Sequence, residues 1–335
     1  MRVDLLPRDG QFYKGNLHSH STLSDGAFTP EELKERYKAA GYSVFAYTEH
    51  GVYHDLRRLD DADFITLPSY EANIIRDYVR TPFPALVKGP STKMQAEVVH
   101  LNMFAIDPEK TTCEPNIDDI KDHASLENVN ELIRRAKNAG FFVSYNHPHW
   151  SLDTGAIYNN LEGLDAIELI NGGSHRSSAM DFVPHVMREM AWNGKRLVAV
   201  AGDDNHQTRH FFQSWTMFKA PELSHKAIIE ALQKGNCYTS MGPEIKELYV
   251  EDGVVHIKTS EAQGIHMATA GRRKPSCVVP IGGDERVTEA EFALAEDDVF
   301  FHIIVKDMYG RPAATRIYFL DEADFGIPPK EEAAK

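Results

Sequence analysis

Histidines and carboxylates recur where predicted strands end, and these residue types together suit a metal centre. His18 and His20 alternate along an extended segment, so both imidazoles project to the same side and could bind one ion. A single such histidine is more often a hydrogen-bonded structural residue than a ligand. Ordinary burial does not explain a whole series at successive strand ends. The candidate ligands are His18, His20, Asp25, His50, Glu71, His100, His147, Asp204 and His206.

The composition of this series indicates which metals and which chemistry it would support. Imidazoles and carboxylates without thiolates suit Zn, Mn or Fe. Clustered divalent ions lower the pKa of bound water, so hydroxide forms at neutral pH and no Ser or Cys nucleophile is needed. The three cysteines, Cys113, Cys237 and Cys277, form no CxxC pair, which argues against a disulfide framework or a zinc ribbon. We expect a metal-activated water near Glu71 to be the nucleophile.

Alternating strands and helices must position these residues. Thr29 and Glu32 form a capping box at the start of a predicted helix that ends at Gly41. Strands alternating with helices predict parallel pairing, hence an α/β barrel or an open sheet, and in a barrel the strand ends meet at one mouth. The other predicted helices cover 129–139 and 179–192, and the predicted strands cover 43–47, 141–145, 164–170 and 196–201.

The pattern changes after about residue 242. Strand-like segments then follow one another with short turns, at 248–250, 254–258, 299–305 and 316–320, and one short helical turn is predicted at 289–294. This pattern favours a small antiparallel, β-sandwich-like domain. We therefore expect a hydrolase domain over 1–240, a C-terminal β domain over 241–325 and a disordered tail over 326–335.

The charge and the hydropathy pattern limit the partners. Lys plus Arg number 36 and Asp plus Glu number 50, so the formal net charge is −14, which argues against nucleic acid as a partner. Charges interrupt the N-terminus before a secretory signal can build, and no apolar run approaches the roughly 18 residues of a membrane span. We expect a cytoplasmic protein with no membrane partner; the sequence does not indicate an oligomeric state.

The ordered series resembles the PHP (polymerase and histidinol phosphatase) superfamily over residues 12–240. The resemblance implies a distorted (β/α)7 TIM-like barrel that binds two or three divalent ions. The matching motifs are His18-Ser19-His20, Asp25, Thr48-Glu49-His50, Glu71, His100, Asn146-His147-Pro148 and Asp204-Asn205-His206.

The same resemblance divides the ligands into three sets. The first implied set is His18, His20, Glu71 and Asp204. In the second, Glu71 bridges to an ion held by His100 and His147, and the third is Asp25, His50 and His206. Many members have Asp at position 49, usually outside the ligand set, and Ser at position 203, so we align Asp204 as the ligand with Asp203 as its substitute.

The trailing β segments make the whole chain similar to the CehA/McbA-type branch, in which a β-rich domain follows the PHP barrel. Residues 237–245 resemble the junction of that branch. The branch includes a carbamate hydrolase as well as phosphoesterases of unknown substrate. Our first hypothesis is a phosphoesterase acting on a small, anionic phosphorylated substrate. The alternatives are a carbamate, ester or amide hydrolase, and a metal-binding recognition module without turnover.

Further polar residues near the predicted mouth are candidates for substrate contact. His149 could act as an acid or bind substrate, or lie on the loop surface. Arg209 and His210 could bind a phosphate or carboxylate, or be an exposed loop cation and its neighbour. With Glu71, these three complete the candidate catalytic residues. Arg176 has a similar status, and a basic lid or a solvated hairpin is predicted for Arg76, Arg80, Lys88 and Lys93.

Overall fold

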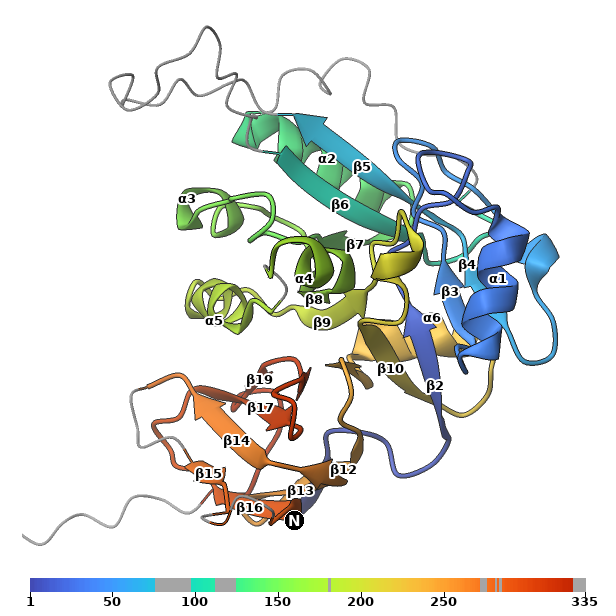
Figure 1. The fold of residues 1–335 in the computed structure, drawn as a ribbon. Coiled ribbons are helices and arrows are strands. Elements are labelled where there is room, and N and C mark those ends of the chain that lie inside the picture. Colours follow the sequence, from blue (N-terminus) through green and yellow to red (C-terminus); the bar gives the residue numbers. More distant parts are fainter. Residues whose placement is uncertain are drawn as a thin grey trace, which may run out of the picture.

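The computed structural model describes residues 1–75, 98–111, 125–179, 182–271, 276–280, 282 and 285–327. The upper part of Figure 1 mixes helices with strands β2–β10, and the lower part consists of strands from β12 onward. The proposed basic lid (Arg76, Arg80, Lys88 and Lys93), Cys113 and residues 328–335 of the predicted tail lie outside the described residues. Among the described residues, no helix combines the length and apolarity needed to cross a membrane.

The longest sheet runs through both parts of the molecule. Its central strands β2 (Gln11–Asn16), β3 (Val44–Ala46) and β4 (Ile65–Leu67) are parallel, and β10 (Trp215–Ala220) joins β2 antiparallel. The remaining members continue the sheet from β10 by antiparallel pairing: β11 (Cys237–Ser240), β18 (Pro312–Ala314), β17 (Phe300–Lys306), β14 (Gly264–Thr269), β15 (Ser276–Val278), and β19 (Tyr318–Phe319) beside β17.

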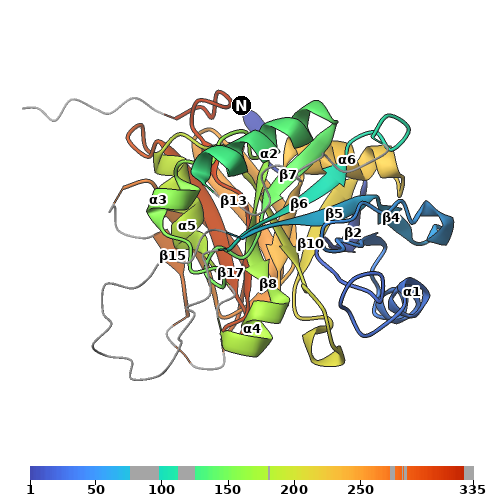
Figure 2. The same cartoon turned by 90° about the horizontal axis from the view of Figure 1, so that it is seen from above.

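A second sheet of five strands completes the upper part. Strands β7 (Phe141–Tyr145), β8 (Ala166–Asn171) and β9 (Val198–Gly202) are parallel. Strand β6 (Val98–Ala105) runs antiparallel to β7 and to β5 (Ser69–Ile75). Figure 2 shows α2 (Leu126–Asn138) lying along β7 and β6, and α6 (His225–Lys234) packs against β10.

The closed (β/α)7 barrel implied by the resemblance is not confirmed. The strands of that region belong to two sheets, joined where β4 runs through Pro68 into β5 and by isolated bridges between His50 and Glu71 and between Ser19 and Asn205. Residue 75 pairs with residue 98, so β6 returns as an antiparallel neighbour of β5. Antiparallel neighbours need no crossover helix, which is why strict β/α alternation fails there.

The predicted helix start at Thr29 is confirmed, and two other assignments are wrong. Thr29 and Glu32 form the reciprocal capping box of α1 (Pro30–Ala39). The helix predicted over 179–192 begins only at Pro184 (α5, Pro184–Trp192), because Ala179 adopts a left-handed φ of 57° that ends α4 (Gly172–Ser178). The turn predicted at 289–294 belongs to β16 (Val287–Ala293), where burial alternates with a period of two. The short α3 (Gly155–Tyr158) was not predicted.

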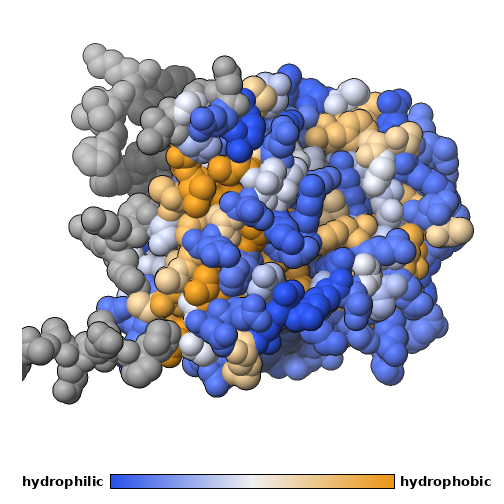
Figure 3. Space-filling view, turned by 90° about the horizontal axis from the view of Figure 1, so that it is seen from below, coloured by the Kyte–Doolittle hydropathy of each residue, from blue (hydrophilic) through white to orange (hydrophobic). Residues whose placement is uncertain are grey.

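A third, four-stranded sheet covers the lower part. Its strands are β1 (Arg2–Asp4), β12 (Ile245–Glu251), β13 (Val254–Ala262) and β16, all antiparallel. Leu248 and Ile257 of this sheet share one buried cluster with Ile265 and Ile303 of the longest sheet, which is the packing of a sandwich. The surface seen from below is largely hydrophilic, with an apolar area toward one side (Figure 3).

The sheets also cross the expected domain boundary. Thr239 and Ser240 of β11 pair with Ala314 and Ala313 of β18, and the N-terminal β1 pairs with β12. A division near residue 240 stays a prediction, because backbone pairing runs continuously across it.

Candidate metal centre

All nine predicted ligands lie together at one end of the upper sheets. His18 and His20 follow β2, His50 follows β3, and His147 follows β7. Glu71 and His100 lie within β5 and β6. Four overlapping groups of possible ligand atoms result: His20, Asp25, His50 and His206; His18, His147 and Asp204; His18, His20 and Glu71; and Glu71, His100 and His147.

Glu71 is the centre of this cluster. Its side chain is 1% exposed, and Asn146 donates to Oε1 at 2.9 Å. The other neighbours are all imidazole nitrogens: Oε1 lies 3.2 Å from His18 Nε2, 3.0 Å from His100 Nδ1 and 3.4 Å from His147 Nε2, and Oε2 lies 3.0 Å from His50 Nδ1 and 3.6 Å from His20 Nε2. One buried carboxylate thus contacts five imidazoles.

The opposite side of the cluster opens to solvent. Asp25 Oδ1 lies 3.5 Å from His50 Nε2 and 3.4 Å from His206 Nε2. These three side chains are 54%, 26% and 29% exposed, whereas His18 and His20 are fully buried. Asp204 lies between the two regions, 3.2 Å from His20 Nε2 and 3.5 Å from His18 Nε2. The cluster therefore has a buried floor and an open mouth.

The observed groups differ in part from the three implied sets. Asp25, His50 and His206 occur together, with His20 added, and Glu71, His100 and His147 form one group. The implied set of His18, His20, Glu71 and Asp204 is instead divided between two groups. The geometry brings all nine residues together without deciding the number of ions or the sharing of ligands.

The free ligand atoms fit divalent ions. His18 Nε2, both ring nitrogens of His20 and Glu71 Oε2 are buried without a hydrogen-bond partner among the described residues. Unpaired buried polar atoms are costly unless a cation compensates them. Two ligand atoms bound at ~2.0–2.2 Å with near-tetrahedral angles lie roughly 3.3–3.6 Å apart. The separations of 3.2–3.6 Å between Asp204 or Glu71 and His18 or His20 match that spacing.

Neighbouring groups orient three of the imidazoles for metal binding. His18 Nδ1 lies 2.9 Å from Glu168 Oε1, His147 Nδ1 lies 3.1 Å from Ser151 Oγ, and His206 Nδ1 lies 3.1 Å from the Asp204 carbonyl oxygen. Each contact suits an Nδ1–H donor, which leaves the Nε2 lone pair facing the cluster. This arrangement is typical of histidines that bind metal ions.

The electrostatics of the cluster follow from its burial and mixed charges. Burial alone would raise the pKa of Glu71, but the surrounding His100, His18 and His147 hold that pKa well below its usual range. Burial alone would lower the pKa of His18, but Asp204, Glu168 and Glu71 raise it well above its usual value. The carboxylates therefore stay ionised and demand positive charge, which protons or metal ions can supply.

The structure separates the roles of the two adjacent aspartates. Asp203 points away from the ligand groups and accepts hydrogen bonds from the backbone N–H groups of residues 212, 213 and 214 and from the Tyr37 hydroxyl. Burial raises the pKa of Asp203 to about 6 although these donors oppose the rise. Asp203 thus anchors the loop that follows β9, and Asp204 faces the imidazoles, as expected from the alignment.

Two supporting carboxylates lie behind the ligands. Glu168, 2% exposed, contacts His18 and also accepts from the His147 N–H at 3.0 Å and from Asn171 Nδ2 at 2.9 Å. The sequence analysis missed Glu168, although a carboxylate inside an otherwise apolar strand was a detectable signal. Glu49, which was placed outside the ligand set, accepts from the Ser21 N–H at 3.0 Å and from the Ser24 hydroxyl, and so holds the loop that carries Asp25.

The remaining candidate residues lie outside the ligand groups of the described structure. His149 is exposed, and its ring lies 6.3 Å from that of His185. Arg209 is exposed and donates from Nε to His210 Nε2 at 3.2 Å. His210 Nδ1 accepts from the His206 N–H at 3.3 Å, so His210 supports a ligand directly. Arg176 is exposed at the far end of α4.

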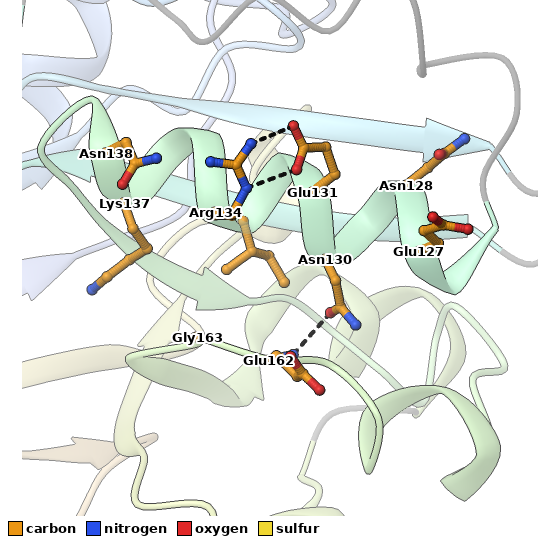
Figure 4. A pocket seen from close by; sticks show the side chains of 10 residues that line it. Glu127, Asn128, Asn130, Glu131, Arg134, Lys137, Asn138, Glu162 and Gly163 are labelled. Carbon is orange, nitrogen blue, oxygen red and sulfur yellow. Dashed lines mark hydrogen bonds and ion pairs between the residues drawn. The ribbon is translucent and has the colours of Figure 1, made fainter.

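A separate groove of about 670 Å³ lies between α2 and the loop at Glu162 and Gly163. Its polar groups already pair with one another, as Arg134 with Glu131 and the Glu162 N–H with Asn130 (Figure 4). It contains none of the metal-ligand groups found among the described residues. The nine-residue cluster is therefore the functional-site candidate.

Comparisons with known proteins add likenesses of fold only. No family model and no curated protein matches the sequence. The chain is similar to a two-domain protein from Bacteroides vulgatus containing a predicted PHP-like metal-dependent phosphoesterase (15% identity, 94% and 97% of the two chains, TM-score 0.45).

Two further solved structures are similar over part of the chain. They are an amidohydrolase from Chromobacterium violaceum (18% identity, 57% and 87%, TM-score 0.35) and the lesion-specific endonuclease EndoQ from Pyrococcus furiosus (14%, 67% and 56%, 0.38). Because every TM-score is below 0.5, the functional argument rests on the geometry of the cluster alone.

Proposed function

We propose that this chain is a metal-dependent hydrolase of the PHP type that acts on a small phosphate ester. The observation that carries the proposal is one buried carboxylate, Glu71, within 3.0–3.6 Å of five imidazoles, below a mouth lined by Asp25, His50 and His206. Such a donor set suits two or three Zn, Mn or Fe ions. Bound there, divalent ions would acidify water and offset charge developing on a scissile group.

The protein's own groups prepare this site. Glu168 and Ser151 fix the orientation of His18 and His147, and Asn146 donates to Glu71. Asp203 holds the backbone of residues 212–214, and His210 holds the backbone of His206 at the mouth. Groups held in this way need little reorganisation when substrate binds, which favours catalysis over loose binding.

The partly exposed mouth favours an anionic substrate. Arg209 lies beside His210, next to the ligand His206, and offers guanidinium donors to a phosphate or carboxylate. Hydrolysis of a carbamate, ester or amide carbonyl would use the same ligands and is the second candidate. A binding module without turnover is the third reading, and the complete ligand set speaks against it.

Metal analysis tests the centre. The purified protein should contain at least two equivalents of Zn, Mn or Fe, and the double variant His18→Ala, His20→Ala should lose them. His256→Ala is the matched control, because His256 lies in β13 and pairs with Glu291. A folded wild-type protein that takes up no metal would refute the proposed site.

A substrate panel tests the chemistry. We expect turnover of a nitrophenyl phosphate or of a bis-ester by the metal-loaded protein, and none by the double variant. Turnover of nitrophenyl acetate or a naphthyl carbamate without phosphate turnover would support the carbonyl alternative. A metal-loaded protein inactive on all four would support the binding module.

A further inference from the structure

The rim of the metal-ligand cluster carries exposed apolar side chains. Leu23, Val52 and Trp150 are 45%, 47% and 42% exposed. Each lies two or three residues from a ligand: Leu23 before Asp25, Val52 after His50 and Trp150 after His147. A rim that served only ions and water would gain nothing from three exposed apolar groups.

Trp150 is the rim residue with direct contacts to the cluster. Its ring lies 5.0 Å from the His147 ring at an interplanar angle of 79°, and 6.0 Å from the His100 ring. Both histidines contact Glu71 Oε1. The indole therefore packs on the outer side of two candidate ligands while much of its surface stays open.

The turn that carries Trp150 is held in place. The Ser151 N–H donates to the His147 carbonyl and the Asp153 N–H to the Pro148 carbonyl, both at 3.0 Å. The Tyr145 hydroxyl donates to Asp153 Oδ2 at 2.6 Å. The position of the indole relative to His147 is thus fixed before any ligand arrives, as in a preorganised binding surface.

A series of rings links Trp150 to the polar side of the mouth. Neighbouring ring centroids are 5.9–6.2 Å apart along this series, which runs Trp150, His100, His50, His206 and His210. One end is an apolar indole, and the other end carries Arg209 beside His210. The mouth therefore offers an aromatic contact at one end and a cation at the other.

We propose that Trp150 is a specificity-determining residue that stacks against a planar, apolar ring of the substrate. This inference rests on the proposed hydrolase function and narrows the substrate to an organic ester with an aryl or similar flat group. The scissile group would lie over the ligand cluster while the ring covers the exposed indole. Stacking on an aromatic side chain adds affinity beyond the burial of area, and this gain is absent for a small alkyl group.

Two pairs of inhibitors measure the ring preference without turnover. Calorimetry with metal-loaded protein would compare phenylphosphonate with methylphosphonate, and benzohydroxamate with acetohydroxamate. We expect the phenyl member of at least one pair to bind the wild type roughly tenfold more tightly. In Trp150→Ala the ratio should fall to about one to two, and Trp150→Phe should keep part of it. The phenyl ligand should also change tryptophan emission in the wild type but not in Trp150→Phe.

Trp192→Ala is the matched control, because Trp192 is also exposed but contacts Phe300, which is not part of the cluster. It should keep the wild-type ratio, and both Trp150 variants should keep their metal. Equal or absent binding of both members in both pairs would overturn this inference, and so would a ring preference that survives in Trp150→Ala. Failure of the proposed function would look different: the hydroxamate ring preference would persist while no ester is hydrolysed.

Discussion

At the scale of single residues, the cluster is a balance between buried carboxylates and imidazoles. Glu71 is almost fully buried, and burying an ionised carboxylate costs several kcal/mol unless positive charge lies close by. The pKa of Glu71 is held low and that of His18 is raised because these groups compensate one another. Divalent cations would take over this compensation, which explains why ligand atoms of His18 and His20 have no other partner among the described residues.

The adjacent aspartates give the first prediction. Asp204→Asn should lose metal, because an amide cannot replace the carboxylate that faces His18 and His20. Asp203→Asn should keep metal but lose about 1–3 kcal/mol of stability, since its NH2 group would oppose N–H donors. Metal content and thermal unfolding of both variants would check this. Metal loss in Asp203→Asn alone would reverse the assignment.

The supporting carboxylate Glu168 gives the second. Glu168→Gln should weaken metal binding about 10- to 100-fold, because the amide no longer fixes the His18 ring and the His147 backbone as an acceptor. Competition with a fluorescent chelator measures the affinity. Glu162→Gln, on an exposed loop, is the control. Equal affinities in Glu168→Gln and wild type would show that Glu168 is only structural.

At the scale of elements, irregular backbone at the strand ends aims the ligands. His147 and Asp204 have φ values of 24° and 46°, a region that costs a non-glycine residue about 1–3 kcal/mol. Gly202, at the end of β9, allows the close approach of the His18 backbone, since an added Cβ would lie 2.4 Å from His18 N. The structure thus accepts local strain where parallel strands deliver their ligands.

Strand β17 provides the third prediction, a pH dependence outside the metal cluster. His302 is fully buried, and burial together with Arg188 lowers its pKa from 6.5 to about 3. The unfolded chain therefore takes up a proton near pH 6.5 that the folded protein refuses. This contribution is complete above pH 6.5 and is lost as the pH falls from 6.5 toward 3, by up to about 1.4 kcal/mol per pH unit.

The variant His302→Leu isolates this effect. Its urea-unfolding midpoint should fall less than that of the wild type between pH 7.5 and pH 5, because leucine binds no proton. At pH 7.5 the two proteins should be of similar stability, since the ring nitrogens of His302 have no hydrogen-bond partner among the described residues. Parallel loss of stability in both proteins on acidification would contradict the assignment.

At the scale of the whole molecule, the C-terminal strands and the metal-binding part share one core. Phe300, Ile317 and Phe319 belong to the same buried cluster as Leu169 and Ala199. Strand β18 also supplies the backbone partner of β11. Truncation after Met241 should therefore prevent stable folding rather than release an active domain.

The magnitude of this fourth prediction follows from the lost burial. Each buried aromatic or large aliphatic side chain is worth a few kcal/mol, and removing several exceeds a typical total stability of about 5–15 kcal/mol. Circular dichroism during heating should show no cooperative transition for residues 1–241. Truncation after residue 327 should leave the transition unchanged. A truncated protein of residues 1–241 that melts cooperatively and binds metal would support independent domains.

The sequence alone determined which side chains could perform chemistry. Histidines and carboxylates at strand ends carry their own signal, because their types and spacing suit metal binding wherever the strands lie. The capping box at Thr29 and the short buried strands were likewise predictable, since they depend on residues close in sequence. Glu168 was missed because its role depends on His18, which lies 150 positions away in the chain.

Only the tertiary structure decided how these parts combine. Pairing of residue 75 with residue 98 placed β6 antiparallel and divided the expected barrel between two sheets. Pairing of β18 with β11 joined the predicted domains, and the contacts of Trp150 with His147 and His100 defined the rim. These features arise from contacts between distant segments, and local residue patterns specify ligand types and strand starts but not which strands become neighbours.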